Sequence, residues 1–270
     1  MEREIVLLWA AICIYVLAGS LAIIAVVMGK RPERTILALL ILALLGHGSA
    51  IVERWIRLDH GPYLTMFEIL NSNIWSLGFV YCLAYWRLKP IRPTAALVMP
   101  VLFMMMGWMM LASPREGSMP ATYDTVWLVI HILFGKVFLG SAFVASAVAV
   151  VILLREMNIG VKYFSRMSDN QSLDILVHKL LVLALIFDSL MLIAGAVWAQ
   201  DAWGRYWAWD PIETWAFMTW LMLGATLHVR ITLKPSPRRG AILTLVTFVL
   251  GFLTFFGVPF LSMTPHKGAV

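Results

Sequence analysis

The sequence contains little charge and almost no cysteine. Of its 270 residues, 13% are charged and 61% are hydrophobic, whereas a soluble domain carries about 25% charged residues. The two cysteines, Cys13 and Cys82, lie singly in apolar segments, so they form no disulfide framework and no metal knuckle. A Cys-x-x-Cys-His motif is also missing, which excludes covalent c-type haem on this chain. The composition therefore excludes a soluble globular protein and favours a protein embedded in a lipid bilayer.

Long apolar segments take up most of the chain. A helix needs about 20 apolar residues to cross a bilayer. Such segments cover residues 5–28, 36–56, 67–86, 94–112, 125–154, 175–198, 212–233 and 241–260. We therefore expect an all-α fold, a polytopic integral membrane bundle with about eight transmembrane helices, which forms a single domain over residues 1–270. The first segment lacks a small-residue cleavage site and is expected to remain as a span.

Basic residues gather in alternate connections between the predicted spans. Four connections hold most of the 21 Lys and Arg residues: Lys30, Arg31 and Arg34; Arg87, Lys89 and Arg92; Arg155, Lys162, Arg166 and Lys179; Arg230, Lys234, Arg238 and Arg239. The positive-inside rule places these connections in the cytoplasm and both termini outside. The net charge of +6 is thus a topology signal, and no nucleic-acid partner is expected.

Tryptophan is concentrated on the outer side. Half of the 12 tryptophans lie between residues 198 and 220, and we predict an external tryptophan-rich loop at 198–215. An aromatic belt at the membrane surface is the plain alternative, but a belt needs only one or two Trp residues at each helix end. The density favours a flat apolar shelf for a planar ligand, with Arg205 available for an anionic group. The tryptophans of this shelf include Trp203, Trp207, Trp209 and Trp215.

The residues Asp210-Pro-Ile-Glu213 also have a structural interpretation. Asp210 suits the N-cap, Pro211 the first helical position, and Glu213 the last position of a capping box. The seventh span is therefore predicted to begin here, with the positive end of its dipole toward the shelf.

The histidines differ in depth. His131 and His266 are placed at the outer ends of the fifth and eighth spans, on either side of the shelf, where two imidazoles suit a haem iron. His228 follows Glu213 by fifteen residues, about 22 Å along a helix, and an ionisable residue inside a membrane is a functional candidate. For the others (His47, His60 and His178) a structural hydrogen bond is the favoured interpretation.

The segment Trp203-Gly-Arg-Tyr-Trp-Ala-Trp-Asp-Pro-Ile-Glu-Thr-Trp215, followed by Leu227-His228-Val-Arg230, resembles the WWD signature of the CcsA (ResC) family of System II cytochrome c biogenesis proteins. The resemblance is strongest from Leu173 to Arg230 and reaches more loosely to Gly61-Pro62, Phe67-Glu68 and His131. It covers most of the chain.

The resemblance implies a function. Members of this family move haem across the membrane, hold haem b at an outer site between two histidines, and present it to apocytochrome c with its Cys-x-x-Cys-His motif. By position His131 and His266 match the outer ligands and His228 the transmembrane ligand. Haem-binding roles are also implied for Trp203, Arg205, Trp207, Trp209, Asp210 and Trp215. The expected partner is a separate CcsB-type polypeptide, with which the chain would act as the membrane component of a holocytochrome c synthase.

The resemblance also implies a location in the inner, cytoplasmic membrane, with the active site on the periplasmic side, or in the thylakoid membrane of a plastid. Two other functions remain open. A cytochrome b-type electron-transfer subunit would use facing histidines such as His178 and His228, although it would leave the tryptophan shelf unexplained. A transporter would need broken helices with polar residues at mid-membrane, and the sequence has few.

Two charged residues lie inside predicted spans. Lys136 is about 17 Å below the outer end of the fifth span, and Asp188 about 15 Å below the outer end of the sixth. Because an isolated charge in a bilayer is costly, opposite charges at similar depth are expected to pair.

Overall fold

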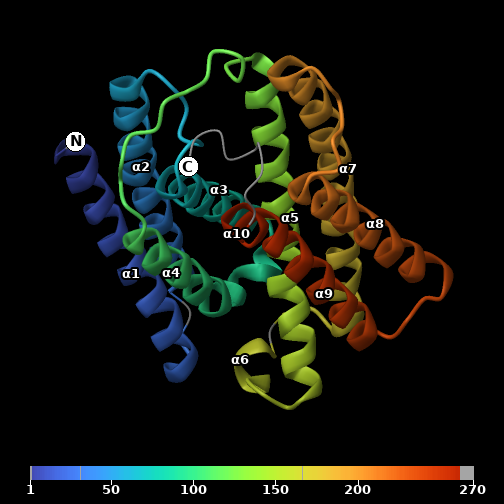
Figure 1. The fold of residues 1–270 in the computed structure, drawn as a ribbon. Helices are drawn as coiled ribbons and strands as arrows, with labels where there is room; N and C mark the ends of the chain where they lie inside the picture. The colour runs from blue at the N-terminus through green and yellow to red at the C-terminus, as the bar shows by residue number, and fades with distance from the viewer. Residues whose placement is uncertain (1, 31, 166, 262–270) are drawn as a thin grey trace. The chain divides into compact units, whose positions relative to one another are not determined.

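The computed structural model describes residues 2–30, 32–165 and 167–261, and all regular structure in them is helical (Figure 1). Eight long helices are found in these residues: α1 (Glu2–Met28), α2 (Glu33–Leu58), α3 (Met66–Arg87), α4 (Ala95–Leu111), α5 (Val126–Glu156), α7 (Asn170–Trp203), α8 (Pro211–Thr232) and α9 (Pro237–Phe256). Three short helices accompany them: η1 (Lys89–Thr94), α6 (Val161–Phe164) and α10 (Val258–Leu261). Each long helix coincides with one of the segments predicted from hydropathy.

Six of the described helices are long and apolar enough to cross a membrane. They are Arg3–Met28, Glu33–Leu58, Lys89–Leu111, Val126–Glu156, Asn170–Trp203 and Pro237–Phe256. The expected fold class, an all-α polytopic membrane protein, is confirmed, while the count of eight spans stays a prediction. The other two long helices, α3 and α8, carry buried polar residues such as Glu68 and Glu213.

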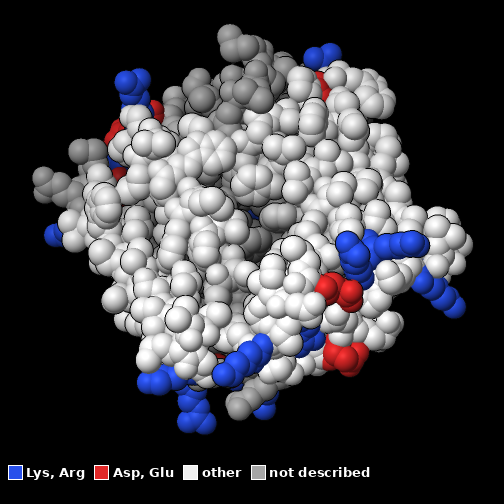
Figure 2. Space-filling model, turned by 90° about the horizontal axis from the view of Figure 1, so that it is seen from below, with Lys and Arg blue, Asp and Glu red and all other residues white. Residues whose placement is uncertain are grey.

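Apolar side chains cover the outside of the helices. Val27, Ile56 and Leu111 are 83%, 77% and 87% exposed. Most of the surface seen in Figure 2 is uncharged, and Lys and Arg atoms cover more of it than Asp and Glu atoms. An apolar surface of this extent fits contact with lipid tails and would make a soluble protein aggregate.

The chain forms two compact units. Of the described residues, the first unit comprises those up to Ser118 together with those in 160–167, and the second comprises Met119–Ile159 and residues 168–261. In the first unit, α1 packs on α2 and α4, and α3 packs on α2 and α4. In the second, α5 packs on α7 and α9, while α8 packs on α7 and α9.

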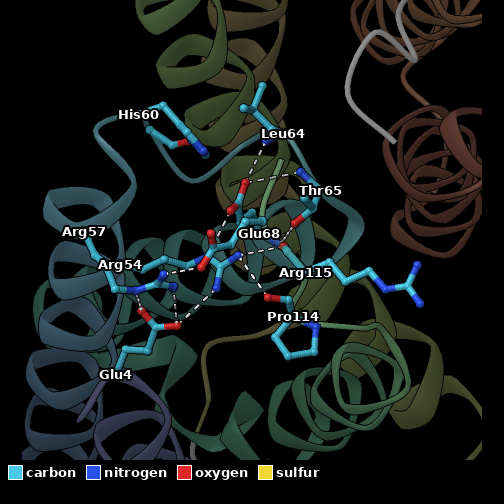
Figure 3. Close-up of polar contacts among 11 residues, drawn as sticks. Glu4, Arg54, Arg57, His60, Leu64, Thr65, Glu68, Pro114 and Arg115 are labelled. Atoms are coloured by element: carbon cyan, nitrogen blue, oxygen red, sulfur yellow. Dashed lines mark hydrogen bonds and ion pairs between the residues drawn. The ribbon is translucent and has the colours of Figure 1, made fainter. Parts of the chain in front are cut away.

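A buried ion network joins three helix ends of the first unit (Figure 3). Arg54, only 1% exposed, donates from Nε to Glu68 Oε1 (2.9 Å) and from Nη1 to Glu4 Oε1 (3.1 Å). Its Nη2 donates to the carbonyls of Pro114 and Arg115, at 3.3 and 3.0 Å. One guanidinium thus links α1, α2, α3 and the segment after α4, and the sequence had not pointed to this link.

The second carboxylate oxygen of Glu68 serves the start of α3. It accepts hydrogen bonds from the backbone N–H groups of Leu64 (3.1 Å) and Thr65 (3.2 Å). The Thr65 hydroxyl accepts in turn from the N–H of Glu68 (3.3 Å), which completes a capping box. Glu68 therefore begins the helix and holds Arg54 at the same time.

Two histidines of the first unit make the structural hydrogen bonds expected of them. His47 lies 2.7 Å from Asn71 Oδ1 through its Nε2, and joins α2 to α3. His60 donates from Nδ1 to the Gly61 carbonyl at 2.9 Å, within the connection between the same helices. Both observations confirm the plainer interpretation of these imidazoles.

Hydroxyl pairs join the helices of the second unit. Thr219 and Thr254 lie 2.8 Å apart through their hydroxyls, and so do Thr226 and Thr247, which links α8 to α9 at two depths. Near the far end of α8, Arg230 donates to Asp174 Oδ1 (2.9 Å). Interhelical hydrogen bonds of this kind stabilise helix contacts where lipid offers no partner.

The predicted ion pair between Lys136 and Asp188 is wrong. Asp188 is fully buried, neither of its carboxylate oxygens has a hydrogen-bond partner, and no ion pair joins it to Lys136 among the described residues. A Cβ on Gly135 would lie 3.0 Å from the Met191 sulfur, so these antiparallel helices place Asp188 level with Phe138. Lys136 and Phe138 are two residues apart, and such residues point in different directions from a helix. Lys136 therefore does not pair with Asp188 although the two lie at similar depth.

The Arg54 network leads to a stability prediction. Arg54→Met should lower the free energy of unfolding by about 3–5 kcal/mol, because Glu4 and Glu68 would remain buried without their cation. Thermal unfolding and folded yield in detergent measure the loss.

Arg57→Met is the matched control. Arg57 also binds Glu4 (3.0 Å), but its side chain is 28% exposed, and exposed pairs contribute about 1 kcal/mol or less. Equal losses in the two variants would contradict the assignment of Arg54 as the centre of the network.

Candidate functional site

The tryptophan-rich segment is a short connection between two helix ends. α7 continues to Trp203, and Gly204 follows with φ +77°, its N–H donating to the Gln200 carbonyl (3.0 Å). A left-handed residue at this place is the usual way to end a helix, and glycine adopts it without strain. The non-helical connection covers residues 204–210 only, so the first and last parts of the predicted loop at 198–215 are helical.

Asp210 begins α8 as predicted. Its Oδ1 accepts a hydrogen bond from the N–H of Glu213 (2.9 Å), and Pro211 occupies the first helical position. The carboxylate of Glu213 in turn accepts a hydrogen bond through Oε2 from the N–H of Ala208 at 2.7 Å. Glu213, 8% exposed, thereby holds the connection against the start of α8.

The aromatic rings form two groups rather than one flat shelf. In the first, Trp198 lies 5.3 Å from Tyr123 and 5.0 Å from Trp203, at interplanar angles of 81° and 76°. In the second, Trp207 lies 5.6 Å from Trp209, at 84°. Edge-to-face packing is favourable for aromatic pairs, so these tryptophans stabilise one another.

A small cavity lies between α5, α7 and α8, within the second unit. Its volume is about 80 Å³, and its lining includes His131, Trp198, Tyr206, Trp207 and Glu213. Pockets that enclose a whole ligand measure roughly 300–1,000 Å³. The cavity therefore accommodates the edge of a planar molecule, while the remainder would lie over the neighbouring aromatic side chains.

His131 is oriented by a backbone carbonyl. Its Nδ1 lies 2.9 Å from the carbonyl oxygen of Met191, and because a carbonyl only accepts, Nδ1 carries the proton. The lone pair of the neutral ring is then on Nε2, the arrangement of a histidine that ligates a metal. The ring also lies nearly parallel to Trp198, at 14° and 6.3 Å.

This position of His131 requires a glycine on α7. A Cβ built on Gly195 would lie 2.7 Å from His131 Nδ1, closer than such atoms approach one another. Gly195 and the Met191 carbonyl were not among the predicted site residues. Their contribution comes from backbone geometry, which the identity of a residue does not reveal.

Trp207, one of the residues that line the cavity, has an unsatisfied donor. The indole N–H of Trp207 is buried and has no hydrogen-bond partner among the described residues. A buried donor without a partner is costly. A ligand that offers an oxygen atom to this N–H would remove that cost. The aromatic side chains, the imidazole and this donor together suit the edge of a haem group.

The other predicted site residues that the structure describes are not among the residues that line the cavity. Arg205 and Trp209 are exposed on the connection, and Trp215 lies in the first turns of α8 without lining the cavity. His228 is exposed on α8, about 22 Å along the helix from Glu213. His266 lies outside the described residues.

Comparisons with known proteins agree with one another. The profile of the family described as Cytochrome C assembly protein matches residues 63–266. The cytochrome c biogenesis protein CcsA of Prochlorococcus marinus (strain MIT 9312) is 29% identical over 282 residues, which cover 94% of this chain and 91% of that protein. CcsA of P. marinus subsp. pastoris is 30% identical over 244 residues, covering 80% and 77%.

CcsA of Chlamydomonas reinhardtii is 27% identical over 256 residues, covering 92% of this chain and 69% of that protein. Among solved structures, the cytochrome c haem lyase CcmF has a similar fold, with a TM-score of 0.72 and 20% identity. The similarity covers 94% of this chain but only 46% of CcmF. The family profile and the CcsA relatives show that this chain belongs to the CcsA family of cytochrome c assembly proteins.

Proposed function

We propose that the second unit holds haem at the cavity beside His131 and presents it for attachment to apocytochrome c. The observation that carries this proposal is that His131, oriented by the Met191 carbonyl, lines one cavity together with Trp198, Tyr206 and Trp207. Family membership supports cytochrome c assembly as the process. The haem, as haem b, is a substrate that this chain binds and passes on.

His131 supplies one axial nitrogen to the haem iron. The Met191 carbonyl holds the Nδ1 proton, which fixes the tautomer and the direction of Nε2. Trp198 lies alongside the imidazole and limits its rotation. On the resemblance to the family, His266 supplies the opposite axial nitrogen.

The connection 204–210 provides the surroundings of the haem. Arg205, exposed on this connection, is suited to a propionate group because its guanidinium binds carboxylates through paired donors. Trp203, Trp207, Trp209 and Trp215 supply apolar surface, and Asp210 fixes the start of α8 beneath them. The positive end of the α8 dipole also favours the haem carboxylates.

Attachment joins this haem to the cysteines of a Cys-x-x-Cys-His motif in apocytochrome c. Each thiol S–H adds across a haem vinyl group, the sulfur bonding to one carbon and the hydrogen to the other, so no oxidant is consumed. The role of this chain is to hold the porphyrin so that both vinyl groups face the incoming peptide. Proximity and orientation of this kind account for a large share of many catalytic accelerations.

His228 belongs to a second site. It is exposed on α8 on a face shared with Met218 (48%) and Leu221 (49%), which are apolar. An imidazole on a lipid-facing stripe is costly unless a partner covers it. We propose that it ligates haem in transit across the membrane, with the opposing histidine supplied by a separate CcsB-type protein in a holocytochrome c synthase of System II.

We propose the orientation from charge and the membrane from the family resemblance. The positive-inside rule favours the outer ends of α5, α7 and α8 and both termini on the non-cytoplasmic side. On the resemblance, this is the periplasmic side of the inner membrane, or the corresponding side of a thylakoid membrane. A bis-histidine cytochrome b-type carrier is not favoured, because the relatives are cytochrome c assembly proteins.

His131→Ala should abolish the maturation of c-type cytochromes while the protein still inserts into the membrane. External imidazole should restore part of the activity, because it can refill the vacant axial position. Haem staining of c-type cytochromes, with and without imidazole, measures the effect. His60→Ala is the control, because His60 bonds only within its own connection. Normal cytochrome maturation in His131→Ala would contradict the assignment of His131 as a ligand of the haem iron.

Gly195→Ala should lower haem content by about tenfold or more, because its methyl group would displace His131 from the Met191 carbonyl. Gly107→Ala is a matched control, since a Cβ there meets nothing within 4 Å. Absorption spectra of the purified proteins compare the two. A Gly195→Ala protein with an unchanged haem spectrum would show that the carbonyl bond to His131 is not needed.

His228→Ala should reduce haem at both sites, because the outer site is filled through the inner one. Haem content per purified complex tests this order, with His131→Ala as the comparison for loss of the outer site alone. A fully loaded outer site in the variant would contradict transit through His228 and leave the His131 assignment intact.

A further inference from the structure

An apolar groove runs along the first unit between α2 and α3. Its volume is about 260 Å³. Its walls are Leu37, Ile41 and Leu45 on α2 and Trp75, Phe79 and Trp86 on α3. Ile41, Phe79 and Trp86 are 46%, 47% and 53% exposed, so the groove opens toward the surroundings of the helices.

The groove is closed at one end. There the indole N–H of Trp75 donates to the Leu44 carbonyl (2.9 Å), and His47 binds Asn71 (2.7 Å). A Cβ on Gly48 would lie 3.0 Å from the Trp75 indole nitrogen, which shows how closely the two helices meet. Beyond this point no extended ligand continues between α2 and α3.

The length of the groove matches one leaflet. Leu37 to Leu45 spans about 12 Å and Trp75 to Trp86 about 16 Å at 1.5 Å per residue. Half of a hydrocarbon core of about 30 Å is about 15 Å. A helix of a partner protein that crossed the bilayer would need an open face along the whole of α2 and α3, whereas a single acyl chain fits a slot of this length.

Basic residues stand at the open end. Arg34 is exposed one turn before Leu37 on α2, and the Arg87 guanidinium lies 4.3 Å from the centre of the Trp86 ring. The acidic residue nearest to this end, Glu33, already pairs with Arg92 at 2.8 Å. Glu33 therefore does not neutralise Arg34 and Arg87, and the open end presents two positive charges.

We propose that this groove binds one acyl chain of an anionic phospholipid, whose phosphate lies against Arg34 and Arg87. The leaflet is the one on the side of these arginines. Trp86 stands in the last turn of α3 beside Arg87, a position that suits the preference of tryptophan for the boundary between tails and headgroups. Each arginine near an anionic headgroup contributes about a fivefold preference over a zwitterionic lipid. The site is independent of the haem cavity in the second unit.

Photo-crosslinking in proteoliposomes tests the site. The purified full chain is reconstituted with phosphatidylglycerol carrying a diazirine on one acyl chain, or with the matching phosphatidylcholine probe. We expect adducts within residues 37–45 and 75–86, several-fold more abundant from phosphatidylglycerol and reduced by unlabelled phosphatidylglycerol.

Matched variants separate the groove from the headgroup site. Ile41→Trp fills the groove and should abolish these adducts, whereas Ile24→Trp, at a residue 51% exposed on α1, should leave them unchanged. Arg34→Gln with Arg87→Gln should remove the preference for phosphatidylglycerol but keep the adducts. The double variant Arg238→Gln with Arg239→Gln makes the same charge change on α9. It should keep both the adducts and the preference for phosphatidylglycerol.

Two outcomes would overturn the proposal: equal labelling of the unaltered chain by the two lipids, or adducts that persist in Ile41→Trp. Either would show that the adducts come from non-specific contact with the surrounding bilayer. A photoreactive amino acid at position 41 in native membranes provides the last comparison. A crosslink to lipid supports the site, while a crosslink to a polypeptide would identify a protein interface instead and overturn it.

Discussion

Hydrocarbon offers no hydrogen bonds, and this constraint decides where the polar side chains of the long helices lie. Arg54 illustrates it in the first unit, where one guanidinium satisfies two buried carboxylates and two backbone carbonyls. Thr219 with Thr254, on α8 and α9, illustrates it in the second unit. In each case a polar group that water would satisfy has been given a partner on another helix, so the polar residues determine how the helices are aligned.

The same constraint shapes the cavity beside His131. A helical carbonyl has two lone pairs, and Met191 uses the second to hold the imidazole of His131. This is possible only because Gly195 allows α5 to approach α7 closely. The imidazole is therefore oriented by main-chain atoms of a helix, which fixes its position more firmly than a flexible side chain would.

Hydropathy was sufficient to locate all the long helices, because a membrane span is specified by composition and length. Local rules also held where the partners are close in sequence, as for Asp210 and the start of α8. They failed where the partner depends on which way a helix faces. Lys136 and Asp188 agree in depth but not in direction, and the bond from Ala208 to Glu213 was not predicted.

Contacts between distant residues were beyond the sequence for a related reason. Arg54 meets Glu4 across fifty positions, and nothing in the composition of either segment selects that pair. The sequence also does not specify the geometry of the aromatic groups. A run of tryptophans indicates that rings will lie close together, but not the angles between them. The interplanar angle of 84° between Trp207 and Trp209 is set by packing with α8, not by spacing.

Buried polar groups without a hydrogen-bond partner are informative, because leaving them unpaired destabilises the fold. Among the described residues, the Trp207 N–H has no hydrogen-bond partner, and neither has either carboxylate oxygen of Asp188. Asp188 precedes Met191 by three residues, so the two share a face of α7, together with Gly195. Trp207 lines the same cavity as His131, and the carboxyl of Asp188 lies one turn along α7 from the carbonyl that orients His131. Both groups therefore lie near the position at which α5, α7 and the connection 204–210 meet, and the described residues supply neither of them with a hydrogen bond.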